Sequence, residues 1–166
     1  MDIVRRPSAS WLRLARTGSF GMLVLLLAQF LTGMVVNIYV KVSDSHPGTS
    51  ASYAAGFWPG VQWAITQGGP GLAIHTALGL GLLAAALGFV VAAVASRQGL
   101  WITASAVALV GIASAGFNGV GFLNYGPDIS TFLMASGFAL ATASYLVVLF
   151  ALREPSAHFS QDRQFD

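Results

Sequence analysis

The chain has 166 residues, of which 55% are hydrophobic and only 8% are charged. Soluble domains carry about 25% charged residues, so this composition leaves too little polar surface to coat a water-soluble globule. The net charge is only +2 and no run of basic residues occurs, which argues against nucleic acid as a partner. The absence of cysteine excludes disulfides, iron–sulfur clusters and cysteine-ligated zinc.

All eight basic and six acidic residues lie outside four apolar windows, which cover residues 20–40, 71–95, 100–123 and 129–152. Each window exceeds the roughly 20 residues that a helix needs to cross the hydrocarbon core. The windows are continuous apolar runs without the alternation of a membrane β-barrel. The sequence therefore predicts an all-α polytopic membrane protein, a four-transmembrane-helix bundle in which residues 1–166 form a single membrane domain.

The basic residues are distributed unevenly around the windows. Lys41, between the first and second windows, is the one base on its side. The other seven share the opposite side: Arg5, Arg6, Arg13, Arg16, Arg97, Arg153 and Arg163. The positive-inside rule then predicts a multi-pass protein of the inner cell membrane with cytoplasmic termini, residues 1–17 and 153–166. Residues 8–17 fit either a short interfacial segment or an ordinary positive flank.

The longest loop, on the predicted outer side, becomes aromatic in its second half. Tyr53, Phe57, Trp58 and Trp63 suit the headgroup layer, where tyrosine and tryptophan are enriched. We expect residues 53–65 to lie along the outer interface as a partial helix that is broken near Pro59 and Gly60.

Small residues recur at four-residue spacing in three of the windows, which favours close helix packing in lipid. These predicted seams are Gly81 with Ala85 and Ala84-Gly88-Ala92 in the second window, Gly111-Ala115-Gly119 in the third, and Ala135-Ala139-Ala143 in the fourth. They favour a compact bundle over loosely tethered helices.

Polar residues inside membrane spans are costly, and each one calls for a hypothesis. In this chain they are Gln29, Thr32, Asn37, His75, Thr76, Ser114, Asn118, Asn124 and Tyr145. Depths estimated at 1.5 Å per residue bring His75 and several of the others toward the outer leaflet. We therefore predict a small polar pocket there, formed by Gln29, Asn37, Asn118 and Asn124.

His75 is the most informative of these residues, and two interpretations stay open. Its imidazole could ligate haem, accept a proton or bind a quinone. Alternatively, it could hydrogen bond to Asn37 or Asn118 and hold helices together. Met134 lies at nearly the same predicted depth and is the second candidate cofactor ligand, because histidine with methionine is a known haem ligand pair.

The segments Gln29-Phe-Leu-Thr-Gly33 and His75-Thr-Ala-Leu-Gly79 resemble small uncharacterised bacterial four-span membrane proteins. They are more distantly similar to membrane haem proteins of the b-type cytochrome and haem A synthase kind, in which a helix pair carries an x-His-x-x-x-Gly pattern. That resemblance implies haem b as a cofactor. Such proteins normally bring a second inward histidine on another helix, whereas the fourth window of this chain has Phe132 and Met134 at the candidate positions.

No other chemistry is indicated by the sequence. The windows hold no charged residue for ion-coupled transport, and no carboxylate shares the depth of His75 to complete a catalytic triad. We therefore predict a non-enzymatic structural or accessory subunit, surrounded by the lipid bilayer and part of a larger membrane complex or a homo-oligomer. The alternative is a haem- or quinone-associated redox subunit with its site near the outer face.

Overall fold

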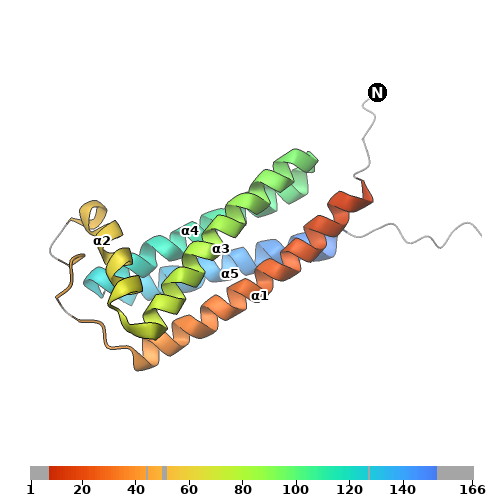
Figure 1. The fold of residues 1–166 in the computed structure, drawn as a ribbon. Coiled ribbons are helices and arrows are strands. Elements are labelled where there is room, and N and C mark those ends of the chain that lie inside the picture. Colours follow the sequence, from red (N-terminus) through yellow and green to blue (C-terminus); the bar gives the residue numbers. More distant parts are fainter. Residues whose placement is uncertain (1–7, 44, 50–51, 127, 153–166) are drawn as a thin grey trace, which may run out of the picture.

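The computed structural model describes residues 8–43, 45–49, 52–126 and 128–152, and this part of the chain contains five α-helices and no strand (Figure 1). The helices are α1 (Ala9–Tyr39), α2 (Tyr53–Thr66), α3 (Gly69–Ser96), α4 (Gly99–Tyr125) and α5 (Asp128–Ala151). All but α2 are long and apolar enough to cross a membrane. The prediction of an all-α, four-helix, multi-pass membrane protein is confirmed.

The four long helices form a ring in which α1 packs on α3 and α5, and α4 packs on the same two helices. Arg97 and Gly126 adopt left-handed backbone conformations, with φ of 58° and 64°, and allow the tight turns that end α3 and α4. The start of α1 and the end of α5 lie at the same end of the bundle, and α2 crosses the opposite end (Figure 1).

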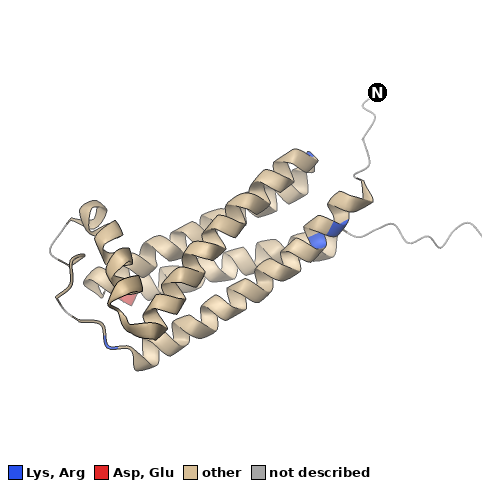
Figure 2. Cartoon of the chain, viewed as in Figure 1, with Lys and Arg blue, Asp and Glu red and all other residues tan. Residues whose placement is uncertain are grey.

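The two ends of the bundle differ in their number of basic residues. Basic residues lie where α1 begins and where α3 meets α4, and one more follows the far end of α1 (Figure 2). We call the first the arginine end, defined by Arg13, Arg16 and Arg97, and the other the α2 end, which holds Lys41 and Asp128. Residues 1–7 and 153–166, including the four other arginines, lie outside the described residues, so their predicted cytoplasmic position stays a prediction.

Helix α1 differs from its predicted boundary, because residues 9–17 continue the spanning helix and form no separate segment. Leucine, alanine and arginine are strong helix formers, and the first helix-weakening glycine is Gly18. At 1.5 Å per residue, the 31 residues of α1 extend about 46 Å, well beyond a hydrocarbon core of about 30 Å. Helix α1 is therefore about ten residues longer than a helix that only crosses the hydrocarbon core.

Helix α2 is continuous from Tyr53 to Thr66, so the predicted break near Pro59 and Gly60 is wrong. Proline removes one backbone hydrogen bond from the middle of this helix. Gly56 and Gly60 are buried on the face that α2 turns toward the bundle. Tertiary packing of this face overrides the local preference for a break.

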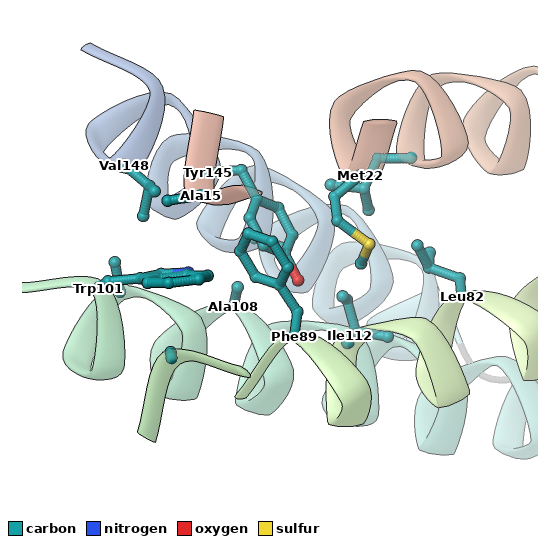
Figure 3. Close-up of a cluster of buried hydrophobic side chains, with 14 residues drawn as sticks. Ala15, Met22, Leu82, Phe89, Trp101, Ala108, Ile112, Tyr145 and Val148 are labelled. Atoms are coloured by element: carbon teal, nitrogen blue, oxygen red, sulfur yellow. The ribbon is translucent and has the colours of Figure 1, made fainter. Parts of the chain in front are cut away.

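The hydrophobic core lies in the arginine half of the bundle and draws side chains from all four long helices (Figure 3). Trp101 and Tyr145 are fully buried. The ring of Phe89 lies edge-on to both, with centroid separations of 5.4 Å to Trp101 and 5.5 Å to Tyr145. Such edge-to-face contacts are favourable for aromatic rings. The aromatic cluster thereby joins α3, α4 and α5.

The small-residue seams are only partly as predicted. Gly111 of α4 does lie in a close contact, because a Cβ there would meet the carbonyl oxygen of Gly137 at 2.6 Å. On α5, however, the packed residues are Gly137 and Ala141. The predicted α5 seam of Ala135, Ala139 and Ala143 is exposed.

The predicted seams of α3 are also only partly right, because Ala85 and Ala92 pack against the core whereas Gly81 and Gly88 have open space around them. The buried small residues of this helix are Ala86 and Ala93. Both helices carry small residues on several faces. Spacing alone could not distinguish a face that meets a neighbouring helix from one that meets lipid.

Candidate functional site

The two sequence segments singled out above face each other across the contact between α1 and α3. The two helices are antiparallel, so Gln29 lies beside Gly79 and His75 lies beside Gly33. A Cβ on Gly33 would approach His75 Cε1 to 3.0 Å, and one on Gly79 would approach Gln29 Nε2 to 3.1 Å. Gln29 of α1 and His75 of α3 are each followed, four residues later, by the glycine that accommodates the other side chain, and Thr32 of α1 adds a third polar group. We call Gln29, Thr32, Gly33, His75 and Gly79 the polar clamp.

Hydrogen bonds within the polar clamp determine the protonation of the ring. Thr32 Oγ1 lies 3.0 Å from the Ala28 carbonyl and 3.1 Å from the Gln29 carbonyl, so it donates its hydrogen to the backbone. Its oxygen must then accept the hydrogen of His75 Nδ1, 3.2 Å away. His75 Nε2 consequently accepts from Gln29 Nε2 at 3.2 Å. This pattern assigns the neutral Nδ1–H tautomer, an inference from the network.

Both nitrogens of the His75 ring are thus occupied by α1. A haem ligand needs a free imidazole lone pair, and that of Nε2 points at the Gln29 amide. The second predicted ligand, Met134, faces α4, where its Sδ lies 3.5 Å from the place of a Cβ on Gly119. The arrangement does not fit a haem held by His75 and Met134. Among the described residues, no cluster of three metal-ligating side chains occurs either.

The four residues of the predicted polar pocket are not brought together around His75. Gln29 does contact it, but Asn37 is exposed near the end of α1. Asn118 donates to the Ser114 carbonyl of its own helix at 2.8 Å. The predicted hydrogen bond from His75 to Asn37 or Asn118 is therefore wrong. In the antiparallel pairing the ring lies beside Thr32 and Gly33, one helical turn short of Asn37.

Asn124 belongs to a second, separate cluster at the α2 end. Its side chain is 5% exposed and lies in a cradle of three glycines, Gly48, Gly56 and Gly60. Its Nδ2 donates to the Gly56 carbonyl at 3.2 Å. A Cβ on Gly60 would lie 2.6 Å from its Oδ1. We call these four residues the glycine cradle; it joins α4 to α2 and to the preceding loop.

His46 strengthens the same junction. It is 7% exposed and stacks on Trp63 of α2, with ring centroids 4.5 Å apart. Its Nε2 donates to the Leu123 carbonyl of α4 at 3.1 Å, and its Nδ1 accepts from Gly48 N at 3.4 Å. His46 lies in the loop between the first two predicted spans, and nothing in the sequence indicated a role for it. The glycines of this loop and of α2, Gly48, Gly56 and Gly60, were the feature of the sequence that could have indicated tight packing here.

Tyr53 adds a third link between α2 and α4. Its hydroxyl donates to the Phe117 carbonyl, and its ring stacks on that of Phe117. Burial raises the pKa of the Tyr53 phenol above its ordinary value, and the nearby Tyr125 raises this pKa further. The hydroxyl is therefore held in its neutral, donating form.

Comparisons of the chain with protein-family models, with curated proteins and with solved structures found no match. The chemistry of the polar clamp and of the glycine cradle is therefore the basis for assigning a function.

Proposed function

We propose that this chain is a structural or accessory membrane protein, and that the polar clamp serves to hold α1 against α3. The observation that carries this proposal is the bonding of both His75 ring nitrogens to α1. Polar contacts between spans are worth about 0.6 to 2 kcal/mol each. The glycine cradle supports the same role, because the buried Asn124 amide of α4 donates its hydrogen bond to α2.

The proposal includes an orientation. We place the arginine end in the cytoplasm of the inner cell membrane, which is supported by Arg13, Arg16 and Arg97 at that end against Lys41 at the other. Large apolar side chains of α1, among them Leu27 and Leu31, are exposed along the bundle. Such a surface suits lipid, a larger membrane complex or a second copy of the chain.

A double-mutant cycle tests the proposed role of His75. Gln29→Leu and His75→Leu each remove one side of the hydrogen bond, so the double variant should lose about 1 kcal/mol less stability than the two single losses combined. The readout is the free energy of unfolding in mixed micelles. Asn118→Leu is the matched control, because its amide bonds within α4 and its effect should add to that of His75→Leu.

The proposal would be contradicted if the stability losses of Gln29→Leu and His75→Leu added as fully as those of Asn118→Leu and His75→Leu. In that case the ring would not depend on α1, and a ligand role would regain support.

The second candidate function is a quinone-associated redox subunit. It is favoured by an apolar groove of about 450 Å³ between α1 and α3, lined by Leu25, Ile74, Ala77, Leu78, Gly81 and Leu82. The groove is lined by Ile74, the neighbour of His75 in α3, whereas His75 itself does not line it. A quinone ring could reach the imidazole only by replacing the Gln29 amide at Nε2.

Filling the groove distinguishes this candidate. Gly81 has open space around it, so Gly81→Phe should fill the groove without touching the polar clamp. Thermal stabilisation of the purified protein by a short-tailed quinone, lost in Gly81→Phe and in His75→Leu, would favour the quinone-associated function. Equal behaviour of all three proteins would remove it.

A further inference from the structure

A shallow pocket of about 320 Å³ opens between the first turns of α1 and the last turns of α5, at the arginine end. Its lining combines two kinds of surface. Arg13, Arg16 and Thr17 provide two guanidinium groups and a hydroxyl, whereas Phe20 and Leu149 provide an apolar floor. The polar residues of this pocket are not part of the polar clamp or of the glycine cradle.

The two arginines have no counter-charge in the described part of the chain. Both side chains are exposed, and neither forms an ion pair there. The one acidic residue within the described ranges is Asp128, at the α2 end. Arg13 and Arg16 are three residues apart and lie on the same face of α1, so their charges act on one site.

The depth of the pocket fits the boundary between hydrocarbon and headgroups. Phe20, whose side chain is 60% exposed, begins the uncharged stretch of α1. Arg16 and Arg13 precede it by four and seven residues, or about 6 Å and 10 Å along the helix axis. The guanidinium groups therefore lie at headgroup level when Phe20 lies at the edge of the hydrocarbon.

We propose that this pocket binds an anionic phospholipid. Guanidinium groups bind phosphate oxygens through paired hydrogen bonds, and the Thr17 hydroxyl can donate a further one. Phe20 lies on the hydrocarbon side of these donors along α1, and Leu149 lines the pocket from α5, so both side chains would contact the start of an acyl chain. A free phosphate would use the charges alone, whereas a phospholipid uses both surfaces. The combination of charge and apolar floor selects the lipid.

Lipid-dependent stability tests this inference. The melting temperature of the detergent-purified chain is measured with added phosphatidylglycerol, with phosphatidylcholine of the same acyl chains, and with inorganic phosphate. A ligand that binds only the folded state raises the melting temperature. We expect a rise with phosphatidylglycerol that is much larger than the rise with the other two. In Arg13→Gln/Arg16→Gln, the apparent affinity for phosphatidylglycerol should fall about 30-fold, because each base near the membrane surface contributes about fivefold.

A matched control separates the pocket from the general charge of the arginine end. Arg97 lies at the same end outside the pocket, and its left-handed backbone is well tolerated by asparagine. Arg97→Asn should therefore keep the phosphatidylglycerol response. Leu149→Ala should weaken it while all the charges remain.

Three results would overturn the proposal: an unchanged response in the double arginine variant, an equal loss in Arg97→Asn, or an equal stabilisation by inorganic phosphate. Co-purifying phospholipid counted by native mass spectrometry gives a second readout that does not depend on the stability of the variants. It should fall in the double variant relative to Arg97→Asn.

Discussion

At the scale of single residues, three polar side chains of this protein lie directly against glycines. Gln29 lies beside Gly79, His75 beside Gly33, and Asn124 among three glycines. In hydrocarbon an unpaired polar side chain is costly, and a glycine opposite it lets the second helix come close enough to supply a partner. The glycines are therefore as much part of these sites as the polar side chains.

The closeness of Gly33 to the ring leads to a specific prediction. Gly33→Leu should destabilise the bundle by about 1 to 3 kcal/mol, because the new side chain must displace His75. Gly21→Leu is the control on the same helix, since a Cβ at Gly21 meets nothing within 4 Å. Thermal unfolding in detergent compares the two variants. Equal stability would show that the ring does not lie against Gly33.

The raised pKa of Tyr53 predicts a loss of stability at alkaline pH. Because folding raises this pKa, the contribution of the hydroxyl is complete below the ordinary value of about 10 and is lost as pH rises through the folded-state value. Difference titration of tyrosinate absorbance between the wild type and Tyr53→Phe should reveal a component with a midpoint above that of free tyrosine. A midpoint at or below that of free tyrosine would contradict the burial of this phenol beside Tyr125.

At the scale of helices, the sequence predicted which segments form spans better than it predicted how those spans contact each other. Four uncharged windows were enough to predict four spans, because length and hydropathy alone decide insertion. The neighbours of each span depend on which faces meet, and the chain offers small residues on several faces. This is why Ala139 was predicted to pack but is exposed, while Gly137 carries the contact.

In the candidate site, too, the residues were predicted better than their contacts. His75 and Gln29 were recognised as polar groups at membrane depth, and their four-residue spacing to Gly79 and Gly33 is visible in the sequence. Pairing of the ring with α1 was one of the two predicted alternatives, through Asn37, but the actual partners Gln29 and Thr32 were not predicted. Distance along a helix gives an approximate depth and does not show which residues of a neighbouring helix meet. His46 was missed because its role arises only after the loop folds back onto α4.

The position of α2 depends on its packing against Asn124 of α4. Gly60→Ala would bring a methyl group within 2.6 Å of Asn124 Oδ1 and should displace α2. The chain has no cysteine, so Ala64→Cys, at a buried position of α2, can report this movement by its labelling rate. Labelling should accelerate in Gly60→Ala.

Two further variants make this experiment decisive. Removing the obstructing amide with Asn124→Ala should slow labelling again in the Gly60→Ala background. Gly88→Ala, at an open position of α3, should leave the rate unchanged. If Gly60→Ala labels no faster than Gly88→Ala, then α2 is not held by the glycine cradle.

At the scale of the whole molecule, charge and helix number point to the same proposed orientation. An even number of spans brings Ala9 and Ala151 to one end (Figure 1), and Arg13, Arg16 and Arg97 share that end. The headgroup-level arginines of α1 and the aromatic α2 helix then occupy opposite membrane surfaces. The two clusters of polar contacts lie at different positions along the bundle axis. The polar clamp joins α1 to α3, and the glycine cradle joins α2 to α4.

Cysteine labelling tests this orientation in intact cells. Ser8 and Ser45 are both exposed and lie at opposite ends of the bundle, so single cysteines there should differ in access. A membrane-impermeant maleimide should label Ser45→Cys from outside and should reach Ser8→Cys only after the cells are opened. The reverse pattern would invert the proposed topology, and labelling of both from outside would contradict the span count.

We propose that His75 holds helices together and does not carry a cofactor. This claim is tested most directly by the absorption spectrum of the chain purified from haem-replete cells, as isolated and after reduction with dithionite. Because both His75 nitrogens are bonded to α1, we predict a spectrum without a Soret band, identical for the wild type and His75→Ala. A Soret band in the wild type that disappears in His75→Ala would contradict the claim.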